Sequence, residues 1–203
     1  MIKKIKTYIS VLIENNLKGY ILLSSIFVAG IVLAIVFGAK TVGEEEIRLY
    51  FSDYIQSVKN SGTEPISTFN LSMKGYIEFA LVMFVSSVTV IGIPLSLIYI
   101  FIRGFSFGTV ICCLFKAFSA RAILIILCAV IPHYIIAMPL CMTFGMYSVK
   151  KTAGLLSGGI SVKRNILIPF LISVCFLCSV SIAALVQAYL EPLLIKLILS
   201  RFV

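Results

Sequence analysis

The sequence predicts an all-α integral membrane protein with about five transmembrane helices, joined by short amphipathic helices at the N-terminus, in 38–74 and at the C-terminus. Hydrophobic residues make up 61% of its 203 residues and charged residues only 12%, and the mean hydropathy is +1.13. This balance is typical of a chain whose main solvent is lipid. The apolar residues also form runs long enough to cross about 30 Å of hydrocarbon. We expect one membrane domain over 1–203.

Positive charge is concentrated at the ends of the apolar runs. The chain has 17 Lys and Arg against 8 Asp and Glu, a net charge of +9. Clusters of lysine and arginine at the N-terminus and in 150–164 would meet anionic lipid headgroups. Binding to nucleic acid is therefore not needed to explain the positive charge. A cytoplasmic N-terminus would place Arg103 and 150–164 inside, and 38–74 and the C-terminus outside.

The first predicted elements are an interfacial helix over 1–19 and a span over 20–37. In 1–19, isoleucine and leucine recur at helical spacing opposite lysine, as in a helix lying flat on a membrane. Glu14 and two asparagines interrupt this stretch and no small-residue cleavage site follows, so we expect no cleaved signal peptide.

The segment 38–74 is the largest polar stretch. Glu44, Glu45 and Glu46 precede apolar residues at helical intervals, which predicts an amphipathic helix whose acidic first turn suits the helix dipole. Two interpretations stay open. The helix lies on the membrane surface, as such helices commonly do, or it is the exposed segment that meets a partner.

The next apolar stretch predicts two spans, over 76–102 and 105–120. Gly92 and Pro94 should kink the first of them, because proline removes one backbone hydrogen bond and clashes with the preceding turn. Arg103 should lie at the turn between the spans, with its side chain among the cytoplasmic headgroups. The alternative for 105–120 is a re-entrant hairpin.

The C-terminal part predicts spans over 122–147 and 166–187, followed by an amphipathic tail over 189–203. Pro132 and Pro139 should break the first of these spans. Because broken helices often line substrate sites, a small-molecule or ion transporter or channel is the alternative to a structural protein. The ionisable groups, however, fall mostly near the predicted span ends.

The segment from Gly104 to Gly108 reads GFSFG and matches the G-x-S-x-G pattern of hydrolases. That motif needs a strained strand-to-helix elbow, whereas here it opens an apolar helix. A catalytic pair of Ser106 with His133, the single histidine, is therefore disfavoured. Two glycines four residues apart favour close helix packing instead, and we expect Gly108→Leu to weaken complex assembly.

No metal or cofactor is predicted. His133 has no second histidine and no carboxylate nearby in the sequence. The six cysteines lie inside apolar runs, where we expect them to pack as small hydrophobes, the C-x-x-C pair included. They are Cys112, Cys113, Cys128, Cys141, Cys175 and Cys178.

Two stretches resemble the stage II sporulation protein M family. VIGIPLSLIYIFIRGFSFG (90–108) has its G-x-P, apolar run, basic residue with glycine, and later glycine. VQAYLEPLLIKLI (186–198) is similar to its closing segment, and the order of elements agrees along essentially the whole chain.

One motif of the broader family, P-H-G-x-x-E-x-P, is only partly kept. The sequence PHYIIAMP keeps Pro132, His133 and Pro139, but has Tyr134 in place of glycine and Ala137 in place of glutamate. Any role of that glutamate cannot be transferred to this chain.

The resemblance implies a non-enzymatic membrane scaffold of endospore-forming bacteria, in the mother-cell septal and engulfing membrane. Such a protein would hold two membrane-anchored peptidoglycan hydrolases, stage II sporulation proteins D and P, during septal thinning and engulfment. The expected partners are these hydrolases, the lipid bilayer and further copies of the chain, with no nucleic acid.

Overall fold

The computed structural model describes residues 17–41, 65–119, 122–157 and 166–194, which form helices and short turns without a strand among them. The chain is an all-α polytopic membrane protein, as predicted. Its elements, in order, are α2 (Leu17–Thr41), α4 (Pro65–Val88), α5 (Gly92–Phe118), α6 (Ala122–Ile125), the π-helical segment η2 (Ile126–Val130), α7 (Ile131–Leu156), α8 (Leu167–Leu185) and the π-helical segment η4 (Val186–Leu190).

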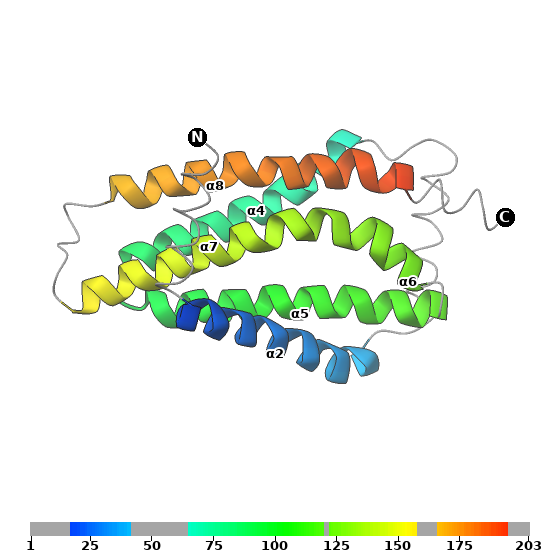
Figure 1. The fold of residues 1–203 in the computed structure, drawn as a ribbon, viewed down its shortest axis with the longest axis horizontal. Coiled ribbons are helices and arrows are strands. Elements are labelled where there is room, and N and C mark those ends of the chain that lie inside the picture. The colour runs from blue at the N-terminus through cyan, green and yellow to red at the C-terminus, as the bar shows by residue number, and fades with distance from the viewer. Residues whose placement is uncertain (1–16, 42–64, 120–121, 158–165, 195–203) are drawn as a thin grey trace.

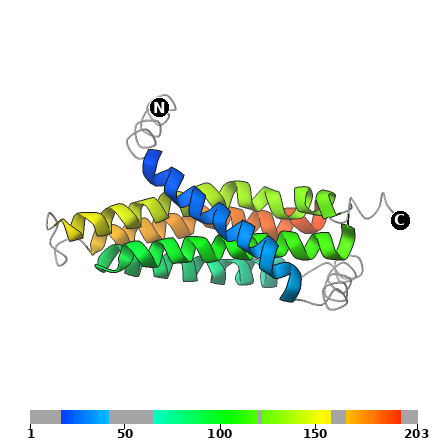
Figure 2. The same ribbon diagram turned by 90° about the horizontal axis from the view of Figure 1, so that it is seen from below.

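The long helices lie side by side and alternate in direction (Figure 1). The start of α2, the α4–α5 turn, the end of α7 and the start of α8 therefore share one end of the bundle. Helix α2 crosses the outer side of α5 at an angle (Figure 2). The described part of the chain contains four helices long and apolar enough to cross a membrane: Leu17–Phe37, Pro65–Val88, Gly92–Phe118 and Leu167–Leu194. The helical stretch from α6 through α7 runs alongside them (Figure 1).

The predicted bounds of the second and third spans are wrong. Helix α4 begins at Pro65 and ends at Val88, and α5 then runs without interruption from Gly92 to Phe118. The turn lies at 89–91. The predicted span 76–102 therefore joins the end of α4 to the start of α5, and the predicted span 105–120 begins in the middle of α5. The turn is hidden in the sequence because its residues are as apolar or β-branched as those of the helices around it.

Pro94 does not kink a helix, contrary to the prediction. It is the third residue of α5, in the first turn, where the backbone N–H that proline lacks would have no partner within the helix. Gly92 begins that helix and lies against α4 and α7. A Cβ at this position would overlap the Ser86 carbonyl and the Thr152 hydroxyl. Glycine is needed here for close approach rather than for bending.

Pro132 and Pro139 do not interrupt the helical path either. The chain stays helical from Ala122 to Leu156, because η2 leads directly into α7 and Pro139 lies inside that helix. Figure 1 shows this path bending along its course. A π-helical segment is one of the known causes of such a bend, and proline is another.

The core is centred on Phe79 of α4, which is fully buried. Its ring centroid lies 5.8 Å from that of Tyr99, 6.3 Å from that of Phe144 and 5.5 Å from that of Phe176. One aromatic side chain thus joins α4, α5, α7 and α8. The predicted interfacial helix before residue 17, the acidic helix within 42–64 and the tail beyond 194 lie outside the described residues.

Candidate functional site at the centre of the bundle

Arg103 lies inside the helix bundle, near the middle of α5. The prediction that it sits among cytoplasmic headgroups at a turn is wrong, because α5 continues through it for another 15 residues. Its guanidinium donates a hydrogen bond to the Gly75 carbonyl. The guanidinium carbon also lies 5.4–5.9 Å from three aromatic ring centroids, those of Tyr76, Phe79 and Tyr99. Aromatic faces attract a cation electrostatically, and the attraction strengthens away from water.

A charged side chain at this place is energetically costly unless it is stabilised. Arginine within a membrane-spanning segment is rare, faces the bundle interior and usually marks a functional site. Arg103 follows this rule, since its neighbours come from α4 and α5 inside the bundle. We therefore take its surroundings as the candidate functional site.

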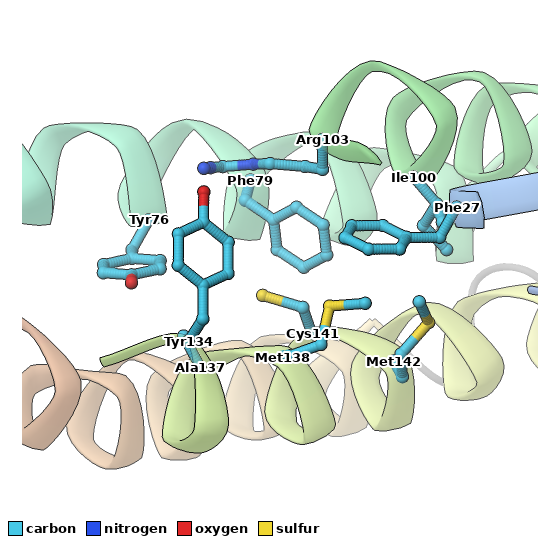
Figure 3. Close-up of a pocket in the computed structure, with 10 residues that line it drawn as sticks. All are labelled: Phe27, Tyr76, Phe79, Ile100, Arg103, Tyr134, Ala137, Met138, Cys141 and Met142. Carbon is cyan, nitrogen blue, oxygen red and sulfur yellow. The ribbon is translucent and has the colours of Figure 1, made fainter. Parts of the chain in front are cut away.

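A small cavity of about 40 Å³ adjoins Arg103 between α2, α4, α5 and α7. Figure 3 shows the Tyr134 hydroxyl directed at the guanidinium, with Cys141 and Met138 on the same side of the cavity. The lining residues are Phe27, Tyr76, Phe79, Ile100, Arg103, Tyr134, Ala137, Met138, Cys141 and Met142. Apart from Arg103, none of these residues carries a full charge at neutral pH.

The two departures from the P-H-G-x-x-E-x-P pattern, Tyr134 and Ala137, both line this cavity. Ala137 is buried on α7, on the side facing Arg103. No carboxylate among the described residues is paired with Arg103. The chain therefore carries a positive charge at the bundle centre, opposite a small apolar side chain.

His133 and Glu191 form a buried pair on α7 and just after η4. They are only 7% and 6% exposed, and His133 Nδ1 contacts Glu191 Oε1. A π-helical segment ends shortly before each partner: η2 before His133 and η4 before Glu191. Segments of this kind occur frequently at functional sites.

Sequence reasoning missed this pair. It found no carboxylate near His133 along the chain, and Glu191 is 58 residues away in sequence. Antiparallel packing of α7 and α8 brings the two residues together (Figure 1). Neither spacing nor composition could have identified the partner, because the contact depends on how α7 and α8 pack against each other.

Ser106 is not brought to His133. It is exposed on α5, where its hydroxyl donates to the Ile102 carbonyl over 2.9 Å within its own helix. Gly104 and Gly108 are buried against α2. A Cβ at Gly108 would lie 2.8 Å from the Ile31 carbonyl oxygen, and one at Gly104 would overlap the Phe27 carbonyl. The G-x-S-x-G stretch thus lies in a helix contact.

The described cysteines are free thiols in varied environments. Cys141 lines the central cavity, while Cys175 and Cys178 are exposed on α8. Within the described ranges, no group of three His, Cys, Asp or Glu residues is placed to hold a metal ion.

Comparison with known proteins places the chain in a family. Residues 22–192 match the family described as stage II sporulation protein M. No curated protein and no solved structure shows a significant match to the chain. The family match reaches from α2 to the residue after Glu191, so it covers most or all of each of the four helices that are long and apolar enough to cross a membrane, and it includes Arg103, His133 and Glu191. The chain belongs to the stage II sporulation protein M family and is a multi-pass membrane protein related to sporulation.

Proposed function

We propose that the protein is a non-enzymatic membrane scaffold that recruits peptidoglycan hydrolases to the sporulation septum, for septal thinning and forespore engulfment. The family match supports a role in sporulation. In the described residues, most hydrogen-bonded polar side chains of the interior join one helix to another, as Ser148 does with the Met83 carbonyl. Such a bundle offers its outer surface to partners rather than an enclosed reaction chamber.

The observation that carries the proposal is the outer face of α4. Lys74 and Glu78 are both exposed there, one helical turn apart, inside the candidate span Pro65–Val88. Their neighbours on this face are apolar, with Leu71 and Leu81 74% and 58% exposed. A charge facing lipid is expensive, whereas a charge facing the anchor helix of a partner can be paired. Membrane-anchored hydrolases would supply such helices.

The test is co-purification. The full-length protein carrying Lys74→Leu and Glu78→Leu together should recover about sevenfold less of the hydrolases from sporulating cells, since two interhelical polar contacts of about 0.6 kcal/mol each are lost. Lys18→Leu, an exposed lysine at the start of α2, is the matched control and should recover normal amounts. Equal recovery with the double variant, at equal membrane levels, would rule out this face.

A transporter is the second candidate function. Arg103 and its cavity at the bundle centre favour it, as do the two π-helical segments. Uptake or conductance by the purified protein in liposomes, lost in Arg103→Met, would support it. Hydrolase recovery that depends on the α4 face, without such uptake, would support the scaffold.

A further inference from the structure

The hydrogen bonds of Arg103 leave most of its donors available. A guanidinium has five N–H donors, and the described structure uses it for one hydrogen bond, to the Gly75 carbonyl. The rings of Tyr76, Phe79 and Tyr99 offer weak electrostatic attraction but no counter-charge. The carboxylate of Glu191 is engaged by His133. The positive charge of Arg103 thus has no paired anion among the described residues.

The cavity beside Arg103 has the size and the chemistry for a small anion. A cavity holds one water when its volume by this measure exceeds about 10–15 Å³, so about 40 Å³ is enough for one small ion together with a few water molecules. The guanidinium supplies charge and donors from α5, and the Tyr134 hydroxyl supplies a donor from α7 (Figure 3). The remaining walls are mostly apolar, and apolar surroundings strengthen the electrostatic attraction between the guanidinium and an anion.

We propose that this cavity is a binding site for a small inorganic monovalent anion, chloride being the simplest example, held by Arg103 and Tyr134. The anion would neutralise the half-buried guanidinium and join α5 to α7 across the cavity. A lipid phosphate is excluded by depth, since Arg103 lies near the middle of α5. Ala137 is buried and contributes a small side chain to the cavity wall. This inference does not depend on the scaffold role.

The experiment uses the full-length protein in detergent micelles. Thermal unfolding is measured in sodium chloride and in sodium gluconate at equal ionic strength, because gluconate is too large for the cavity. If chloride binds the folded state, Tm should rise with chloride by roughly 3–5 °C for each tenfold increase above the Kd. In Arg103→Met the difference between the two salts should vanish, while Lys18→Met, which removes a charge far from the cavity, should keep it.

A second variant keeps the proposal testable if Arg103→Met does not fold. Ala137→Glu would place a fixed carboxylate at the cavity wall and displace the anion. Its Tm should be the same in both salts and at least as high as that of the unmodified protein in gluconate. Broadening of the chloride NMR line by the unmodified protein should be lost in this variant. Equal Tm values for the unmodified protein in both salts, or an unchanged chloride response in Ala137→Glu, would overturn the proposal.

Discussion

Two of the helix contacts made by α5, those with α2 and α7, are built in opposite ways. Toward α2, α5 presents Gly104 and Gly108, and α2 presents Gly30, whose added Cβ would lie 2.5 Å from the Phe101 carbonyl oxygen. The backbones touch there. Toward α7, α5 presents Ser96, whose hydroxyl donates to the Ser148 hydroxyl over 3.1 Å. The first contact is steric and the second is polar.

Helix α7 continues the polar contact toward α4. The Ser148 hydroxyl donates to the Met83 carbonyl over 3.0 Å, and the Thr152 hydroxyl donates to the Ser86 carbonyl over 2.7 Å. At the other end of the bundle the Ser72 hydroxyl donates to Gln187 over 2.7 Å, which joins α4 to η4. The interior of α4, α7 and α8 thus contains several interhelical hydrogen bonds and the buried contact between His133 and Glu191.

Both the steric contact with α2 and the polar contact with α7 are ways of joining helices in lipid. Lipid tails are as apolar as leucine, so helices associate in a membrane through close van der Waals packing and interhelical hydrogen bonds. A contact built on glycine is disrupted when a side chain is added at the glycine, because the added atoms clash with the neighbouring backbone. A buried polar contact tolerates replacement of both partners but not loss of one.

The largest effect should come from adding atoms to the steric contact. Gly104→Leu would drive a side chain into the α2 backbone at Phe27, which cannot move aside as a side chain can. We expect destabilisation above the 1–3 kcal/mol that is usual for overpacking, about 3 kcal/mol or more, and loss of folded protein. Thermal unfolding in detergent measures it, and a disulfide engineered between α2 and α5 should no longer form.

Gly75 provides the matched control on α4. A Cβ there would meet only the Arg103 guanidinium, at 3.9 Å. Gly75→Ala should change stability by less than about 1 kcal/mol, or raise it slightly through helix propensity. If Gly104→Ala is tolerated as well as Gly75→Ala, the α2–α5 contact is looser than described.

The next effect should come from breaking the buried ion pair on one side. His133→Leu leaves the Glu191 carboxylate buried without its partner, and we expect a loss of about 3 kcal/mol. Adding Glu191→Leu should restore most of this stability, because two apolar side chains then replace two polar ones. A double-mutant cycle measured by thermal unfolding gives the coupling. Additive losses would mean that the two residues act separately.

A smaller effect is expected from one hydrogen bond of the polar contact. Thr152→Val keeps the shape of the side chain and removes its bond to the Ser86 carbonyl. Interhelical hydrogen bonds in membranes contribute about 0.6 kcal/mol on average, so the loss should be about 0.5–1.5 kcal/mol. A loss as large as that of Gly104→Leu would remove the distinction between the two contacts.

The smallest effect should come from Ser106, which belongs to neither contact. Its hydroxyl bonds within α5 and its side chain is exposed. Ser106→Ala should change stability by less than about 0.5 kcal/mol and leave sporulation unchanged in a spore-count assay. A severe sporulation defect at normal protein levels would revive a reactive role for this serine.

The local sequence pattern predicted the positions of some helices correctly and those of others incorrectly. The first span was predicted over 20–37 and lies within α2, and the last was predicted over 166–187 and coincides, from its second residue, with α8 and the start of η4. The α4–α5 turn was misplaced, because Val90 and Ile91 are as apolar as the helices they join. Proline and glycine suggested a kink at 92–94, whereas both residues begin a helix.

The sequence by itself determined the class of the molecule, a helical membrane protein, because composition and the length of apolar runs are local properties that decide whether a segment can cross lipid. Its motifs and their order, in turn, carried the resemblance to the stage II sporulation protein M family. Only the tertiary structure decided that Arg103 lies inside the bundle beside a cavity, and that His133 meets Glu191. Those placements depend on which helices pack together and at what register. Such relations join residues far apart in the chain, and no pattern within a single helix encodes them.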